Sequence, residues 1–239
     1  MKVEIWSDVV CPWCYIGKRR FESALAQFAH RDDVEVEWRS FELDPSTESV
    51  SSPGQGPNHA ELVATKYGMP LAQAEAAVAS VTRAAAAEGL DFHLDRSLQS
   101  NTFDAHRLVH LAADHGRQGE VKERFMRAYF GEAEPVGDHD ALVRLAVDAG
   151  LDRDEVVRVL ATDEYADAVR ADEAEARVLG ISGVPFFVVD RKYGVSGAQP
   201  ADQLLQVLER AWSERPPLTL VGAGQQDTQE SCGPDGCAI

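Results

Sequence analysis

A strand-like sequence gives way to a helix-like one within the stretch Ser7-Asp8-Val9-Val10-Cys11-Pro12-Trp13-Cys14-Tyr15-Ile16-Gly17. Residues 2–8 have the apolar character of a buried strand, and residues 12–29 carry apolar side chains in partial helical register. Residues 34–41 alternate apolar and polar side chains, which predicts a second strand. The chain therefore opens with a predicted βαβ unit that places a Cys-Pro-Trp-Cys motif at its first strand-to-helix turn.

A long helical block follows this opening. Ser, Gly and Pro residues make 46–58 a predicted loop, and helical patterns fill most of residues 59–180. Prolines and glycines mark where helices begin and end. The predicted helices lie between Pro70 and Gly89 and over residues 98–115, 118–130, 138–149, 152–161 and 163–179.

Strand patterns return after the helical block. Residues 185–190 and 192–196 predict a β-hairpin, and a last helix is expected over 200–213. This order is typical of one α/β domain that is interrupted by a helical insertion. We therefore predict four parts: residues 1–45 and 181–215 as the two pieces of the α/β domain, 59–180 as an inserted all-helical domain, and 216–239 as a flexible tail.

The cysteines indicate redox chemistry rather than a disulfide framework, because the four of them fall into two close pairs. At a helix start, Cys11 would face unpaired backbone amides and the positive end of the helix dipole, which favour its thiolate. Cys14, one turn later, could attack a mixed disulfide at Cys11 and release the substrate. Pro12 suits the first helical turn, and Trp13 would contact a peptide or a small thiol at the mouth of the site. The same spacing also occurs in zinc sites.

The charge balance excludes several kinds of partner. Asp and Glu outnumber Lys and Arg by 40 to 23, and the formal net charge is −17. Such a field repels nucleic acid and anionic lipid, so neither is expected as a partner. The longest apolar runs fall far short of the roughly 20 residues that a membrane span needs, and the start of the chain lacks a secretory signal. We therefore expect a cytoplasmic protein, of an oligomeric state that the sequence does not fix.

The stretch around Cys11 resembles the active-site segment of the DsbA-like family, and specifically of its FrnE-like cytoplasmic branch. The resemblance implies a thioredoxin-like fold with an inserted helical domain, in agreement with the order of elements above. Three further segments carry it: Phe41-Glu42-Leu43-Asp44-Pro45, Asn101-Thr102-Phe103-Asp104-Ala105-His106-Arg107, and Gly183-Val184-Pro185-Phe186-Phe187 with Ser196-Gly197-Ala198-Gln199.

The resemblance also implies a thiol-disulfide oxidoreductase or isomerase and assigns residues to its site. Pro185 would follow a cis peptide bond and face the cysteines, and Val184 would bind substrate backbone. On the residues alone, Pro185 could also merely begin an edge strand. The segment with Asn101 and His106 would line the cleft over the cysteines, with Asp8 nearby, although Asn101 alone predicts a helix cap.

The expected substrates are protein or small-molecule disulfides and thiols, with glutathione as a candidate co-substrate and no other cofactor. No metal is predicted, because His106 and His110 share a helix face without a third ligand. The direction of electron flow depends on how strongly the site stabilises the thiolate, which Pro12 and Trp13 do not decide.

The tail carries the second pair in Cys232-Gly233-Pro234-Asp235-Gly236-Cys237. A turn between the two cysteines could bring their β-carbons within the roughly 4 Å that a disulfide needs. Some FrnE-like proteins carry a similar pair that is proposed to act with the first, so Cys232 and Cys237 are a candidate accessory redox pair. An inert terminus is the alternative, and a four-cysteine zinc site is a third.

A second function is open at this point. The predicted architecture also resembles 2-hydroxychromene-2-carboxylate isomerases and kappa-class glutathione transferases, which implies a glutathione-dependent isomerase or transferase as the alternative. The segment with Asn101 and His106 fits those relatives. They use serine as the nucleophile, however, whereas this motif has Cys11 and Cys14, which favours thiol-disulfide exchange. A non-catalytic zinc-bound or partner-binding module is the remaining hypothesis.

Overall fold

A mixed four-stranded sheet forms the centre of the computed structural model, which describes residues 1–50 and 58–215. The strand order is β2-β1-β3-β4. Strand β1 runs parallel to β2 and antiparallel to β3, and β3 pairs antiparallel with β4. The strands are β1 (Lys2–Ser7), β2 (Glu35–Ser40), β3 (Phe186–Val189) and β4 (Tyr193–Ser196). The first and last parts of the described chain therefore share one sheet, in the predicted α/β, thioredoxin-like arrangement.

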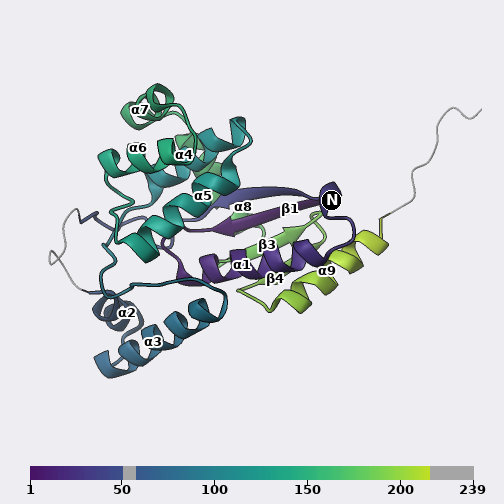
Figure 1. The fold of residues 1–239 in the computed structure, drawn as a ribbon, viewed down its shortest axis with the longest axis horizontal. Helices are drawn as coiled ribbons and strands as arrows, with labels where there is room; N and C mark the ends of the chain where they lie inside the picture. Colours follow the sequence, from purple (N-terminus) through teal and green to yellow (C-terminus); the bar gives the residue numbers. More distant parts are fainter. Residues whose placement is uncertain (51–57, 216–239) are drawn as a thin grey trace, which may run out of the picture.

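The two faces of the sheet are covered by different helices, and the alternation along β1 shows why. Val3 and Ile5 enter the main core on the face of α1 (Pro12–Gln27) and α9 (Ala201–Ser213), which pack side by side (Figure 1). Trp6 points to the opposite face, because side chains alternate along a strand. There it joins a smaller apolar cluster with Ala176 and donates a hydrogen bond from Nε1 to the Asp172 carbonyl oxygen at 2.9 Å. Ala176 and Asp172 both belong to α8 (Ala166–Val178).

The insertion lies between β2 and β3 and surrounds the end of the sheet where β1 leads into α1 (Figure 1). Helices α4 to α7 gather on one side of this end, and α2 and α3 on the other. A short 3-10 turn, Arg31–Asp33, precedes β2. The remaining bounds are α2 (His59–Tyr67), α3 (Leu71–Ala87), α4 (Phe103–Asp114), α5 (Gln118–Arg127) with a π-helical turn (Ala128–Glu132), α6 (His139–Asp148) and α7 (Arg153–Ala161).

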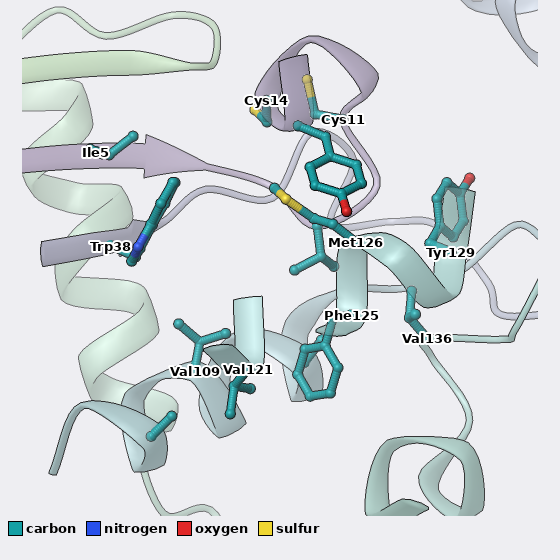
Figure 2. Close-up of a cluster of buried hydrophobic side chains, with 14 of the residues drawn as sticks. Ile5, Cys11, Cys14, Trp38, Val109, Val121, Phe125, Met126, Tyr129 and Val136 are labelled. Atoms are coloured by element: carbon teal, nitrogen blue, oxygen red, sulfur yellow. The ribbon is translucent and has the colours of Figure 1, made fainter. Parts of the chain in front are cut away.

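The insertion and the thioredoxin-like part share one hydrophobic core. The Tyr15 ring on α1 lies 5.9 Å from the ring centroids of both Phe92 and Phe130, which belong to the insertion. Figure 2 shows another part of this core, in which Ile5 and Trp38 from the sheet belong to the same buried cluster as Val121 and Phe125 from α5. The insertion thus shares buried apolar side chains with α1, and the domain boundaries drawn from the sequence stay a prediction.

Helix α4 begins later than the sequence pattern predicts, at Phe103 instead of residue 98. The cause is Asn101, whose side-chain nitrogen donates to the carbonyl oxygens of Pro45 and Thr47 at 3.3 and 3.2 Å. Its Oδ1 accepts from the Phe103 backbone N–H at 3.0 Å, which supports the start of the helix. The segment before Phe103 is therefore tied to a neighbouring loop and is not helical.

The first part of the insertion contains two separate helices, α2 and α3. Helix α2 ends at Gly68, which adopts the left-handed conformation with φ 62°.

Among residues 1–50 and 58–215, no helix is long and apolar enough to cross a membrane. The predicted tail 216–239, with Cys232 and Cys237, lies outside the described residues.

Candidate active site

Cys11 and Cys14 lie at the turn from β1 into α1, as the motif predicts (Figure 2). Cys11 is the N-cap residue, with φ −87° and ψ 114°, and Pro12 begins the helix. The backbone N–H of Cys14 donates to the Cys11 carbonyl oxygen at 3.0 Å. Both cysteines are free thiols, and their exposed fractions are 4% for Cys11 and 1% for Cys14. The N-cap position places the Cys11 sulfur at the end of the helix that favours an anion.

The two thiols have different surroundings. Burial raises the pKa of the Cys14 thiol, and its hydrogen bond with Cys11 raises it further. The backbone N–H of Asp8 and the charge of Lys122 act in the opposite direction. The Cys14 thiol is therefore buried and has a raised pKa, which disfavours its ionisation. Cys11, in contrast, lies at the edge of a cleft.

The Val184–Pro185 peptide bond is cis and faces the cysteines. The Cys11 thiol donates to the Val184 carbonyl oxygen at 3.6 Å. Pro185 is buried against α1 at Gly17, where an added Cβ would lie 2.8 Å from the proline Cγ. A close helix-to-loop contact thus holds Val184 beside the Cys11 sulfur, and its contact with substrate stays a prediction.

A cleft of about 980 Å³ opens at Cys11. Pro12, Trp13 and Val184 line it on the thioredoxin-like side, and Trp13 is 44% exposed at the rim. The opposite wall comes from α2, α3 and their flanks, and includes Leu62, Val63, Val78 and Val81. This size and apolar lining suit a small organic thiol or a short segment of polypeptide.

Asn101 and His106 do not line this cleft, in contrast to the expectation for them. The cleft wall contains the neighbours of Asn101, Ser100 and Thr102, because the Asn101 side chain is held by the adjacent loop. His106 is fully buried, and its Nε2 lies 3.3 Å from Asp8 Oδ1. His106 is therefore placed in the protein interior, where its Nε2 can orient the Asp8 carboxyl group.

Asp8 and His106 form a buried pair in which the carboxyl is favoured in its charged form and the imidazole in its neutral form. Burial alone would raise the pKa of the Asp8 carboxyl, but the His106 hydrogen bond and the Leu43 backbone N–H, at 2.8 Å, bring it below its usual value. Burial lowers the pKa of the His106 imidazole. A neutral His106 that donates from Nε2 to an Asp8 carboxylate is consistent with both directions.

Sequence reasoning missed Lys122, a fully buried residue of α5. Its Nζ donates to the Ser7 carbonyl oxygen at 3.0 Å, four residues before Cys11. Burial lowers the Lys122 pKa to about 8, although the charges of Cys14, Asp8 and Cys11 raise it. The sequence carries no signal for its burial, because a lysine on an amphipathic helix is normally exposed to solvent.

The described residues contain no group of three His, Cys, Asp or Glu side chains that could hold a metal ion. A four-cysteine zinc site would also need Cys232 and Cys237, which lie outside those residues. The zinc hypothesis for the two cysteine pairs is thus decided by metal analysis of the whole protein.

The fold and the site together define a thioredoxin-fold protein with a two-cysteine centre beneath a helical insertion. A family model described as the DSBA-like thioredoxin domain matches residues 2–209, and the chain belongs to this family of DsbA-like oxidoreductases. The family resemblance seen in the sequence is confirmed.

Individual relatives agree with this assignment. A solved "probable DsbA oxidoreductase" from Streptomyces coelicolor is 51% identical, with a TM-score of 0.84 over 100% of this chain and 99% of its own. The uncharacterised protein YwbO of Bacillus subtilis (strain 168) is 30% identical over 189 residues, 78% of this chain and 86% of YwbO. The cytosolic disulfide reductase DsbM from Pseudomonas aeruginosa, solved with glutathione, shares the fold at 18% identity, with a TM-score of 0.59 over 89% of this chain and 100% of its own.

Proposed function

We propose that this protein catalyses thiol-disulfide exchange, with Cys11 as the nucleophile and Cys14 as the resolving thiol. The contact that carries the proposal is the one from the Cys11 thiol to the Val184 carbonyl oxygen at the edge of the cleft. It places the reactive sulfur where an incoming disulfide can reach it, while Cys14 is buried one turn along the same helix.

The reaction follows from this order of access. The Cys11 thiolate attacks one sulfur of a substrate disulfide and forms a mixed disulfide, and the other substrate sulfur leaves as a thiolate. Cys14 then attacks Cys11, and the second substrate thiol is released. The substrate disulfide is reduced by two electrons and the cysteine pair is oxidised. The same steps in reverse oxidise a substrate dithiol, and the direction depends on the relative potentials.

The cleft supports a role for Pro12, Trp13, Val184 and Pro185 in binding the substrate. Trp13 offers an exposed apolar surface, and the Val184 backbone lies beside the reactive sulfur. We expect protein or small-molecule disulfides and thiols as substrates, glutathione as a thiol co-substrate, and action in the cytoplasm. Asn101 and His106 would then act indirectly, through the loop at Thr47 and through Asp8.

Activity assays with cysteine variants test the proposal. Insulin reduction and the oxidative refolding of a reduced protein should both be lost in Cys11→Ser. Cys14→Ser should accumulate a mixed disulfide with the substrate, detected as added mass on the intact protein. Unchanged activity in Cys11→Ser would contradict the assigned nucleophile.

The tail pair supports a second step of the same chemistry. The 17 residues from Arg215 to Cys232 can extend up to about 60 Å, more than twice the roughly 24 Å length of α1. We propose that Cys232 and Cys237 exchange disulfides with Cys11. The Cys232→Ser/Cys237→Ser variant should alter turnover while leaving the first exchange event intact. Stoichiometric zinc in protein purified without chelator would instead favour a metal site.

The glutathione-dependent isomerase or transferase remains a separate hypothesis. The site does not favour it, because cysteine occupies the position where those relatives have serine. Conversion of an aromatic substrate by Cys14→Ser in the presence of glutathione would support it over thiol-disulfide exchange.

A further inference from the structure

Helix α5 places one ammonium group in the core behind the two cysteines. The Lys122 side chain is 0% exposed, and its Nζ lies 5.8 Å from the centre of the Trp38 ring. Its hydrogen bond goes to a backbone carbonyl oxygen, that of Ser7, which carries no full charge. A buried ammonium without a dedicated carboxylate costs several kcal/mol. Packing alone would favour an apolar side chain here, so the charge needs another explanation.

The anions around Lys122 are of two kinds. Asp8 and Asp172 are carboxylates, and each has its own donors. Asp8 accepts from the Leu43 backbone N–H and from His106. Asp172 accepts from the Ser40 backbone N–H, Arg39 and His110 at 2.8, 2.9 and 3.0 Å.

The second kind of anion near Lys122 is the thiolate that Cys11 or Cys14 forms during exchange. The titratable groups whose charges act on Lys122 are Cys11 at the N-cap of α1, Cys14 on α1, Asp8 in the turn, His106 on α4 and Asp172 on α8. Negative charge on Cys14 and on Cys11 raises the Lys122 pKa, so the same charges are stabilised by the ammonium group. Since both carboxylates are already satisfied, the charge that Lys122 can stabilise when the protein works is the thiolate of the cysteine pair.

We propose that Lys122 is a positioning residue for the resolving step, and that its ammonium group stabilises the Cys14 thiolate as it attacks the mixed disulfide on Cys11. The inference rests on the proposed exchange activity. In this step a bond forms between the Cys14 and Cys11 sulfurs, and the bond from Cys11 to the substrate sulfur breaks. The Cys14 thiol first gives its proton to water, and the electron pair of the broken bond leaves with the substrate sulfur as a thiolate. Lys122 keeps its proton throughout.

The two exchange events can be observed separately with 5,5′-dithiobis(2-nitrobenzoate). Attack by Cys11 releases one coloured thiolate, and attack by Cys14 on the resulting mixed disulfide releases a second. The experiment uses the full chain with Cys232→Ser and Cys237→Ser, so that only the first pair reacts. Absence of a second release in this parent protein, or a first release that survives Cys11→Ser, would refute the exchange activity itself and not merely the role of Lys122.

In Lys122→Met, the second release should be about threefold slower below pH 8. Removal of the charge raises the Cys14 pKa and so lowers the fraction of thiolate. The more basic thiolate is intrinsically more nucleophilic, which offsets part of this loss. Above pH 8, where Lys122 itself loses its proton, the two proteins should converge in rate. A change in packing would slow the variant equally at every pH and would not produce this convergence.

Two further variants separate charge from structure. Lys122→Gln keeps an N–H donor for the Ser7 carbonyl oxygen but removes the charge, so it should behave as Lys122→Met does. Arg124→Met removes another positive charge from α5, one that is paired with Glu132 at 2.8 Å, and both releases should keep their rates. A second release that Lys122→Met and Lys122→Gln leave unchanged, or slow no more than the first at every pH, would overturn the proposal.

Discussion

Gly17 is the residue of α1 on which the place of Pro185 depends. A Cβ at this position would lie 2.8 Å from the Pro185 Cγ, closer than carbon atoms pack in proteins. A methyl group here must therefore move the proline ring away from α1. Val184 precedes that ring and contacts the Cys11 thiol, so the movement would reach the reactive sulfur.

We predict that Gly17→Ala lowers kcat/KM for insulin reduction about tenfold, because small displacements of positioning groups are costly to catalysis. The melting temperature should change little, since alanine is better than glycine in a helix by about 1 kcal/mol and offsets part of the clash. Gly119→Ala on α5 is the matched control, because no described atom lies within 4 Å of its added Cβ. Full activity in Gly17→Ala would show that α1 does not position the loop.

Lys122 predicts an unusual dependence of stability on pH. Its pKa in the folded protein is about 8, below the value of 10.5 expected when it is exposed. Between these two values the unfolded chain binds the extra proton, so stability rises with pH across this window. Below pH 8 both states are protonated and the full penalty, about 3 kcal/mol, is present.

Lys122→Met should therefore be more stable than the wild type at pH 7, by up to about 3 kcal/mol. The gain should shrink as pH rises from 8 to 10.5. Urea unfolding at pH 7 and pH 10 measures both quantities, and titrations elsewhere in the chain cancel in the difference. A variant less stable than the wild type at pH 7 would contradict this account.

Some residues of the site could be predicted from the sequence and others could not. Cys11 and Cys14 could be predicted from their spacing, and Pro185 from the segment that resembles the family. Lys122 could not, because a lysine on an amphipathic helix is normally solvated, and only the docking of α5 against β2 decides that this one is buried. His106 likewise shares its helix with exposed residues, and only its contact with Asp8 identifies its role.

At the scale of elements, Glu123 joins α5 to α1. It accepts a hydrogen bond from the Tyr15 hydroxyl at 2.5 Å and pairs with Lys18 and Arg19. Burial would raise the Glu123 pKa, but these partners lower it to about 2. The ionised carboxyl therefore fixes the helix that carries Lys122 to the helix that carries Cys14.

We predict that Glu123→Gln lowers the free energy of unfolding by about 1–3 kcal/mol at pH 7, because it weakens several charge-assisted hydrogen bonds. The folded pKa is lower than the unfolded one, so this contribution is present above about pH 4.5 and is lost as pH falls toward 2. The difference from the wild type should accordingly be smaller at pH 3 than at pH 7. Glu120→Gln, exposed on the same helix, should show no such difference.

Most elements could be predicted from periodicity and punctuation, and the exceptions have local causes. Strand β1 and helix α1 fall within the predicted ranges because alternation and apolar register agree with their burial. The start of α4 could not be predicted, because residue 98 onward is held by hydrogen bonds from Asn101 to a loop more than 50 residues earlier. Long-range contacts of this kind leave no periodic signal in the sequence.

The whole molecule acts on its substrates through its net charge of −17. The Debye length falls from about 30 Å at 0.01 M salt to about 8 Å at 0.15 M, so salt weakens this long-range field. We predict that exchange with anionic glutathione disulfide becomes a few-fold faster over this range, whereas exchange with cationic cystamine becomes slower. Stopped-flow rates, with neutral 2-hydroxyethyl disulfide as the control, measure the effect. Equal salt dependence for all three would contradict it.

The pairing of β1 with β3 sets an order of events when the chain is made. A ribosome delivers Ile5 and its partner Phe187 at opposite ends of synthesis. Until Val184 has emerged, a nascent chain holds both Cys11 and Cys14 but lacks the carbonyl group that the Cys11 thiol contacts. The helices of the insertion are delivered first. The redox centre is therefore among the last parts of the protein to be completed, and its thiols spend most of synthesis without the surroundings that govern them.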